Sequence, residues 1–373
     1  MRVADRDGRP ILVRVIVWGG SFALAFSIFV GYFIYQAVMN PFPRSNVRIE
    51  GDRDIEIDPQ IGFIQSRNAS TLRSLANTDF RYQIFTDRRS ARVNEKGQQT
   101  PDRVDMLTVG GSFAHGHGMA NEHSFTERLG RATGLRVANF SLGSYGTTQS
   151  WQMLERNLDL RPKLVIYAFI EHHLWRNINP CAPSYSYCLA VAYVAFEDDD
   201  EARPYLHPPH FDIVPPDMDR RFMEEVVVAD ERSLLTEVIW KMRTAVYDVR
   251  GATVFWPKDT ESRRREAFRF LLERMVDATE SIDATLLVVY IPNVTPGDVY
   301  PPPEILVDLV ASHDIVFVDL YPVFSKHYSD PSNPVLYLRK DDDHPNELAH
   351  ALIAETLLKV IHEDSRVRQK LGL

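Results

Sequence analysis

The chain has 373 residues, of which 45% are hydrophobic and 25% are charged, and its formal net charge is −9. This composition is that of an ordinary globular protein and allows one large domain or two small ones. A net negative charge argues against nucleic acid as a partner, because phosphate binding requires a basic face. No segment of roughly 20 to 50 residues repeats itself along the chain.

The N-terminus departs from this composition. Val15–Met39 contains no charged residue, and as a helix it would span roughly 37 Å, enough to cross a hydrocarbon core of about 30 Å. A cleaved signal peptide is the alternative, but the apolar part is too long and no small-x-small site follows. Residues 1–14 are predicted to stay in the cytoplasm, because basic residues precede the span at Arg2, Arg6, Arg9 and Arg14.

The sequence therefore predicts a single-pass protein of the inner membrane, with residues 15–39 as the transmembrane helix and the lipid bilayer as a partner. Everything after about residue 40 would then be periplasmic, or more generally outside the cytoplasm. The two cysteines agree with this orientation, since Cys181 and Cys188 lie close together in one proline-containing loop. A local disulfide is expected for such a pair in an oxidising compartment. Two free thiols are the alternative, and a metal site is disfavoured because no CxxC spacing is present.

Residues 40–103 are predicted to form a linker and a small cap region, with short strands at Arg48–Glu50 and Tyr82–Phe85. From Val104 onward, strand and helix patterns alternate, which indicates a parallel sheet between helical layers. The expected strands are Met106–Val109, Arg136–Phe140, Lys163–Phe169, Ala284–Pro292 and Ile315–Leu320. The expected helices are Ser124–Thr133, Gln149–Leu158, Thr260–Thr279, Glu304–Ser312 and Pro345–His362.

The predicted fold class is therefore α/β, a three-layer α/β/α sandwich with a central, mostly parallel sheet, over residues 104–366. An insertion at about 190–258 interrupts the alternation with an acidic stretch and clustered prolines, followed by a helix near Ser233–Val249. Long insertions in compact domains are often lids or binding loops. A structural flap is the equal alternative.

The first strand ends in a motif that points to chemistry. Met106–Val109 breaks into Gly110-Gly111-Ser112, which is typical of a buried strand that turns sharply and raises one hydroxyl above the sheet edge. A serine is a poor nucleophile alone and requires a base. The far end of the chain offers one in the run Asp341–Asn346, which contains His344.

Together these two segments resemble the SGNH (GDSL-type) hydrolase family, whose parallel sheet is flavodoxin-like. The resemblance assigns Ser112 as nucleophile, His344 as base and Asp341 as the acid that orients the base. Two further segments match the family's sequence blocks in order and spacing. Asn139–Gln149 resembles the second block, and Leu164–Asn177 lies in the position of the third block. Roughly residues 100–180 and 284–360 are covered. The resemblance implies a serine esterase that uses no cofactor.

The identity of the acid depends on the family spacing alone. Three aspartates stand in a row, and physical reasoning would also admit Asp342. If Pro345 is the first residue of the last helix, His344 lies at or just before its cap and Asp341 lies in the preceding loop. A loop can turn either carboxylate toward the imidazole, where it would fix the tautomer and stabilise the imidazolium.

The chain departs from the family pattern at three places. Gly111 replaces an aspartate, Ser144 replaces a glycine, and His172-His173 replaces an Asn-Asp pair. The expected oxyanion hole comprises the backbone N–H groups of Ser112 and Ser144 and a side-chain N–H of His172. Protonation of His172 would then alter activity near about pH 6–7.

Around this centre, substrate contacts are expected from Gly143, Tyr145, Gly146 and His115. His115 and His117 flank the nucleophile turn but have no obvious carboxylate partner, so no metal site is predicted.

The family resemblance and the expected compartment together imply a membrane-anchored, extracytoplasmic serine esterase for an acylated, most simply O-acetylated, carbohydrate. Hydrolysis and acyl transfer differ only in the nucleophile that resolves the acyl-enzyme, so the sequence does not separate a deacylase from an acyltransferase. The alternative is a catalytically weak module that binds glycan or acts as a scaffold. Proteins of polysaccharide assembly are further candidate partners.

Overall fold

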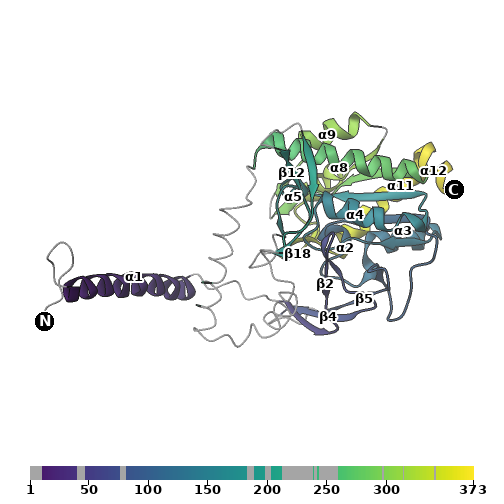
Figure 1. Ribbon diagram of the computed structural model, residues 1–373. Helices are drawn as coiled ribbons and strands as arrows, with labels where there is room; N and C mark the ends of the chain where they lie inside the picture. The colour runs from purple at the N-terminus through teal and green to yellow at the C-terminus, as the bar shows by residue number, and fades with distance from the viewer. Residues whose placement is uncertain are drawn as a thin grey trace.

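A computed structural model describes residues 11–39, 47–75, 81–182, 189–197, 203–211, 238, 242, 259–295, 298–313, 315–339 and 342–373. Helix α1 (Ile11–Met39) lies apart from the α/β domain (Figure 1). Among the described residues it is the only helix long and apolar enough to cross a membrane. Large apolar side chains along it, including Trp18, Phe22 and Ile28, are exposed, whereas Phe33 is buried against Val238 and Met242. An apolar surface of this size is unfavourable in water and is typical of a helix that contacts lipid or a protein partner.

The centre of the domain is a run of five parallel strands within one nine-stranded sheet. In spatial order the five are β8 (Val137–Asn139), β7 (Met106–Gly110), β9 (Leu164–Phe169), β14 (Thr285–Tyr290) and β17 (Val316–Asp319). Counted along the chain, this is the doubly wound order 2-1-3-4-5. Every residue of β7 and β9 is buried, as expected for strands that helices cover on both faces.

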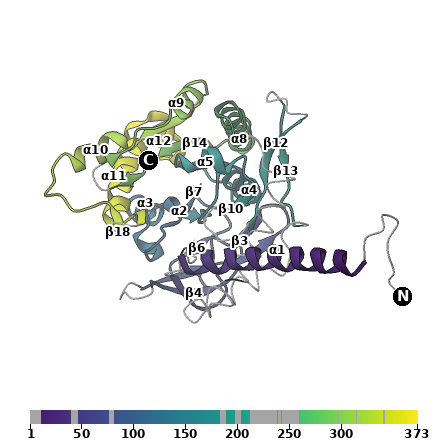
Figure 2. The same cartoon turned by 90° about the vertical axis from the view of Figure 1, so that its left-hand side faces the viewer.

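Two helical layers enclose these strands (Figure 2). One face packs against α4 (Thr147–Arg156), α8 (Glu261–Ser281) and α9 (Glu304–Ala311). The other packs against α3 (Phe125–Thr133), α10 (Tyr321–Tyr328), α11 (Glu347–Glu363) and α12 (Ser365–Leu371). The predicted three-layer α/β/α architecture with a mostly parallel sheet is confirmed.

The region predicted as linker and cap contributes to the same sheet. Four antiparallel strands continue it beyond β8, namely β6 (Arg92–Val93), β5 (Arg81–Thr86), β4 (Ser70–Leu75) and β1 (Val47–Gly51). The junction is the pairing of Arg92 with Asn139 of β8. The two predicted short strands are present as β1 and β5. The other strands form because the edge of β8 offers backbone groups for pairing, a feature invisible in the local sequence.

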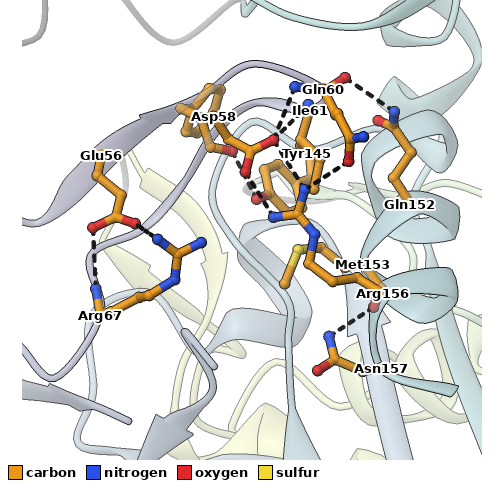
Figure 3. Close-up of polar contacts among 11 residues, drawn as sticks. Glu56, Asp58, Gln60, Ile61, Arg67, Tyr145, Gln152, Met153, Arg156 and Asn157 are labelled. Atoms are coloured by element: carbon orange, nitrogen blue, oxygen red, sulfur yellow. Dashed lines mark hydrogen bonds and ion pairs between the residues drawn. The ribbon is translucent and has the colours of Figure 1, made fainter. Parts of the chain in front are cut away.

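A separate hairpin, β2 (Ile55–Asp58) and β3 (Gly62–Gln65), packs on α4. Figure 3 shows Arg156 reaching from α4 to Asp58, with nitrogen–oxygen distances of 2.7 and 3.0 Å. The same carboxylate accepts the backbone N–H of Ile61 at 2.9 Å, and Gln152 donates to the Gln60 carbonyl at 3.0 Å. These bonds fix the hairpin, and with it Gln65, against the domain.

The segment around the predicted base differs from expectation. The last long helix begins at Glu347 rather than Pro345, and the Asn346 side chain caps it by accepting the backbone N–H of Ala349 at 3.0 Å. Asp342–Pro345 forms strand β19, paired with β18 (Tyr337–Arg339). Asparagine is among the best N-caps, which explains why the helix starts one residue after it.

The remaining elements are short. The pairs β10 (Cys181–Ala182) with β11 (Leu189–Ala190), β12 (Tyr193–Phe196) with β13 (Pro204–His207), and β15 (Val294–Thr295) with β16 (Asp298–Val299) are two-stranded. 3₁₀ turns occur at Asn121–His123 and Leu158–Leu160. Cys181 is disulfide-bonded, while Cys188 lies outside the described residues. So does the predicted helix Ser233–Val249, apart from Val238 and Met242.

Candidate active site

The nucleophile candidate stands at the carboxyl end of the central strand. Ser112 opens the short helix α2 (Ser112–His115) directly after β7 and Gly111. Gly116 ends α2 in the left-handed conformation, with φ of 79°, which glycine adopts without steric cost. Ser112 is only 7% exposed. It therefore lies at the edge where doubly wound sheets bind their ligands.

The candidate base comes from the other end of the chain. His344 lies on β19, which contacts α2, and its ring centre is 5.3 Å from that of Phe113. His344 Nδ1 is 2.6 Å from Oδ1 of Asp342, and the His344 backbone N–H donates to the same oxygen at 3.2 Å. The fold thus brings the segments of Ser112 and His344 side by side at one edge of the sheet.

Asp342 is the carboxylate that the structure pairs with this histidine. Asp341, the acid that the family spacing assigns, lies outside the described residues. Burial would raise the pKa of Asp342, but the hydrogen bond and charge of His344 outweigh it and lower that pKa to about 2. An ionised carboxylate on Nδ1 directs the other ring nitrogen, Nε2, to act as the proton acceptor.

The second block borders the nucleophile. A Cβ added to Gly143 would lie 4.0 Å from the Ser112 Cβ, so the backbone at Gly143 faces the serine without a side chain between them. Ser144 has φ of 67°, the left-handed region that favours glycine. Ser144 therefore adopts, despite its side chain, a backbone conformation that a glycine at this position would adopt without steric cost.

Two of the three departures from the family pattern compensate for each other. His173 is fully buried, and its Nδ1 is 2.7 Å from the Tyr167 hydroxyl. A Cβ at Gly111 would lie only 2.9 Å from Nε2 of His173. An aspartate at position 111 therefore does not fit beside this histidine, and glycine does. The same Cβ would lie 3.4 Å from Nη1 of Arg176, which donates to the Tyr145 carbonyl at 3.0 Å.

His172 opens α5 (His172–Arg176) and is half-buried. Burial and the positive charge of Arg176 lower its pKa below the ordinary 6.5, against the opposing charges of Asp343 and Glu171. The imidazole is therefore neutral at neutral pH and able to donate one N–H. The change in its protonation is expected at lower pH than the range inferred from an unperturbed histidine.

Three residues expected to touch substrate lie within the protein framework. Tyr145 is buried and donates its hydroxyl to the Phe63 carbonyl at 2.9 Å. His115 is also buried, with Nε2 2.8 Å from Oε1 of Gln65. Gly146 caps α4, and a Cβ there would meet Oδ1 of Asn177 at 2.9 Å. The contacts of these three residues are thus with other parts of the protein.

The loop that follows Ser112 is held by an arginine that none of the sequence motifs includes. Arg92, from β6, is fully buried and donates to the carbonyls of His115, Gly116 (2.9 Å) and Met119 (2.7 Å). Burial lowers its pKa to about 10, so it remains charged at neutral pH. Its partners are backbone carbonyls, which no residue pattern reveals.

Arg92→Met should destabilise the protein by about 3 kcal/mol, because three buried carbonyls lose a charged donor. Denaturant unfolding of the full chain in detergent, followed by tryptophan fluorescence, measures this change. The matched control is Arg88→Met, which removes an exposed ion pair with Asp102 and should cost less than about 0.5 kcal/mol. Equal losses in the two variants would contradict the role given to Arg92.

Comparison with known proteins finds similarity at the level of structure only. No family model matches the chain, and no curated protein does. Solved structures that match include a protein assigned to the G-D-S-L lipolytic family from Desulfitobacterium hafniense, with 15% identity, 68% of this chain and 98% of that chain covered, and a TM-score of 0.35. A GDSL-like lipase from Bacteroides thetaiotaomicron shows 10% identity, coverage of 72% and 93%, and a TM-score of 0.33.

A family two carbohydrate esterase from Clostridium thermocellum matches with 10% identity, coverage of 70% and 65%, and a TM-score of 0.35. GDSL-type hydrolases and carbohydrate esterases thus stand among the solved structures that this chain is similar to.

Proposed function

We propose that this chain is an SGNH-type serine esterase, anchored in the inner membrane by α1, that acts on an acylated carbohydrate outside the cytoplasm. The observation that carries the proposal is the Asp342–His344 pair, held at 2.6 Å on a strand that contacts the helix opened by Ser112. A buried serine at the end of a parallel strand, with an oriented imidazole on the strand that contacts its helix, supplies the nucleophile and the base that acyl transfer requires.

In the proposed reaction, Ser112 Oγ attacks the ester carbonyl carbon while His344 accepts the hydroxyl proton. The oxyanion accepts hydrogen bonds from the backbone N–H groups of Ser112 and Ser144 and from His172. When the tetrahedral intermediate collapses, the C–O bond to the sugar breaks and His344 returns the proton to the departing hydroxyl. Water, or a second sugar hydroxyl, then releases the acyl group from Ser112 by the same steps. The substrate class follows from the motif resemblance and the proposed compartment.

A serine-directed phosphonate tests this proposal directly. Incubation of the full chain in detergent should phosphonylate Ser112, and peptide mass spectrometry should locate the label there. Protein unfolded by heat before the incubation should take up no label, because only the assembled triad activates the serine. A folded protein that takes up no phosphonate and cleaves no acetyl ester would instead favour the glycan-binding module, the role that the altered third block suggests.

The third oxyanion donor can be tested by substitution. His172→Ala should lower kcat for an acetyl ester by about 10²-fold with little change in KM, since an oxyanion-hole donor acts mainly in the transition state. His172→Asn should retain most of the activity, because an amide supplies an equivalent N–H. Steady-state kinetics of the two variants provides the comparison. Full activity in His172→Ala would remove this residue from the oxyanion hole.

The proposed topology predicts where the C-terminus lies. Alkaline phosphatase fused after Leu373 folds only in an oxidising compartment, so the fusion should be active in cells. A second fusion, of a fluorescent protein that matures only in the cytoplasm, should remain dark. The opposite pair of results would reverse the orientation of α1.

A further inference from the structure

A third titratable side chain stands beside the proposed base. His117 follows α2, and its ring centre lies 4.3 Å from that of His344, with the rings tilted by 37°. On another side it approaches Tyr82, at 6.0 Å between ring centres. Ligand atoms of His117, Asp342 and His344 all lie within 4.8 Å of one another, and all three residues are partly exposed. The reaction proposed above uses two of these residues and leaves His117 without a role.

The sequence disfavoured a metal at His115 and His117 because no carboxylate stood near them. The fold supplies one from the far end of the chain, Asp342, and removes His115, which is bonded to Gln65. What remains is a set of two imidazoles and one carboxylate with a solvent-facing side. Three such protein ligands with an open position for water are the donor set of zinc sites that are not purely structural.

We propose that His117, Asp342 and His344 bind Zn²⁺, and that the ion inhibits the esterase reversibly. The ligand atoms lie within 4.8 Å of one another, against roughly 3.5 Å expected around an ion with bonds of about 2.0–2.2 Å, so small side-chain rotations would bring all three to bonding distance. Similar ions with a preference for imidazole, such as Co²⁺, should occupy the same position.

Zn²⁺ would inhibit the esterase whichever ring nitrogen of His344 it binds. If Zn²⁺ binds Nε2 of His344, the atom that accepts the Ser112 proton is blocked. If it binds Nδ1, it displaces the proton shared with Asp342, which leaves to solvent, and breaks the pair that orients the ring. In both cases His344 no longer moves a proton. This regulation presupposes the proposed esterase function, whereas binding of the metal does not.

Binding is tested in full-length Ser112→Ala protein, so that no turnover at Ser112 accompanies the titration. Isothermal titration should show one Zn²⁺ per chain, and Co²⁺ should give a visible absorption band from mixed nitrogen and oxygen ligands. Adding His117→Gln should weaken Zn²⁺ binding by about tenfold or more, a change of about 1.4 kcal/mol per factor of ten. Adding His123→Gln should leave it unchanged, although His123 lies between two surface carboxylates, Glu122 and Glu347.

Equal Zn²⁺ affinity with and without His117, in variants with the same unfolding midpoint, would overturn the site. The inhibitory role is measured separately in active protein. Zn²⁺ should abolish ester cleavage at the concentration that saturates binding, EDTA should restore it, and His117→Gln should require about tenfold more Zn²⁺ for the same fractional loss. Undiminished cleavage by zinc-saturated protein would overturn the inhibition. Since titration needs no turnover, metal binding is measurable even in a chain without esterase activity.

Discussion

Ser112→Ala should reduce kcat/KM for an acetyl ester by about 10⁴-fold or more, because loss of the nucleophile in a triad removes the whole covalent route. Hydrolysis of 4-nitrophenyl acetate by the full chain in detergent measures it. The substitution removes one oxygen from a residue that is 7% exposed and adds no atoms. The unfolding midpoint is therefore expected to stay near that of the parent.

The matched control is Ser141→Ala. Ser141 is also buried, and its hydroxyl has no hydrogen-bond partner among the described residues. It lies three positions before Ser144 in the second block. Its substitution therefore changes a serine in the same region that has no role in the proposed reaction. Its variant should keep activity within about twofold, as expected for a small change at an uninvolved position. Turnover that survives in Ser112→Ala would reject the serine mechanism.

The position of Ser112 at the end of a strand could be predicted from the sequence because its signal is local. An apolar β run followed by Gly110, Gly111 and Ser112 requires a strand that ends in a tight turn, and β7 and α2 have these bounds within a residue. The parallel strands and their covering helices were likewise predictable, since strands buried on both faces are continuous apolar runs.

The segment of the base was predicted less well because tertiary contacts determine its conformation. Asp342, Asp343 and Pro345 are poor strand formers, yet the segment forms β19 by pairing with β18. The placement of Arg92 was also beyond the reach of the sequence. A lone arginine in a charged, turn-rich stretch looks solvent-exposed, and only the antiparallel continuation of the sheet carries it beneath the nucleophile loop.

Asp342→Asn is the second substitution with a large expected effect. Removing the charge that pairs with His344 should lower kcat by about 10³–10⁴-fold, since an amide at this place favours the wrong imidazole tautomer and does not stabilise the imidazolium. The effect should persist across the pH range of the enzyme, because the pKa of Asp342 is lowered to about 2 and its carboxylate is ionised throughout. A pH profile of kcat for the variant and parent checks this.

Asp341→Asn provides the comparison that separates family spacing from geometry. If Asp342 is the orienting acid, the Asp341 variant should lose less than about tenfold, as a neighbouring charge acts only through the field it adds at the imidazole. The reverse ranking would assign the acid three residues before the base, as in the family, and would mean that the 2.6 Å contact of Asp342 with Nδ1 is exchanged for one with Asp341 during turnover. Either ranking requires His344 as the base. Comparable small losses in both variants would show that neither carboxylate orients His344, and the Ser–His–Asp mechanism would then be wrong even if Ser112 is essential.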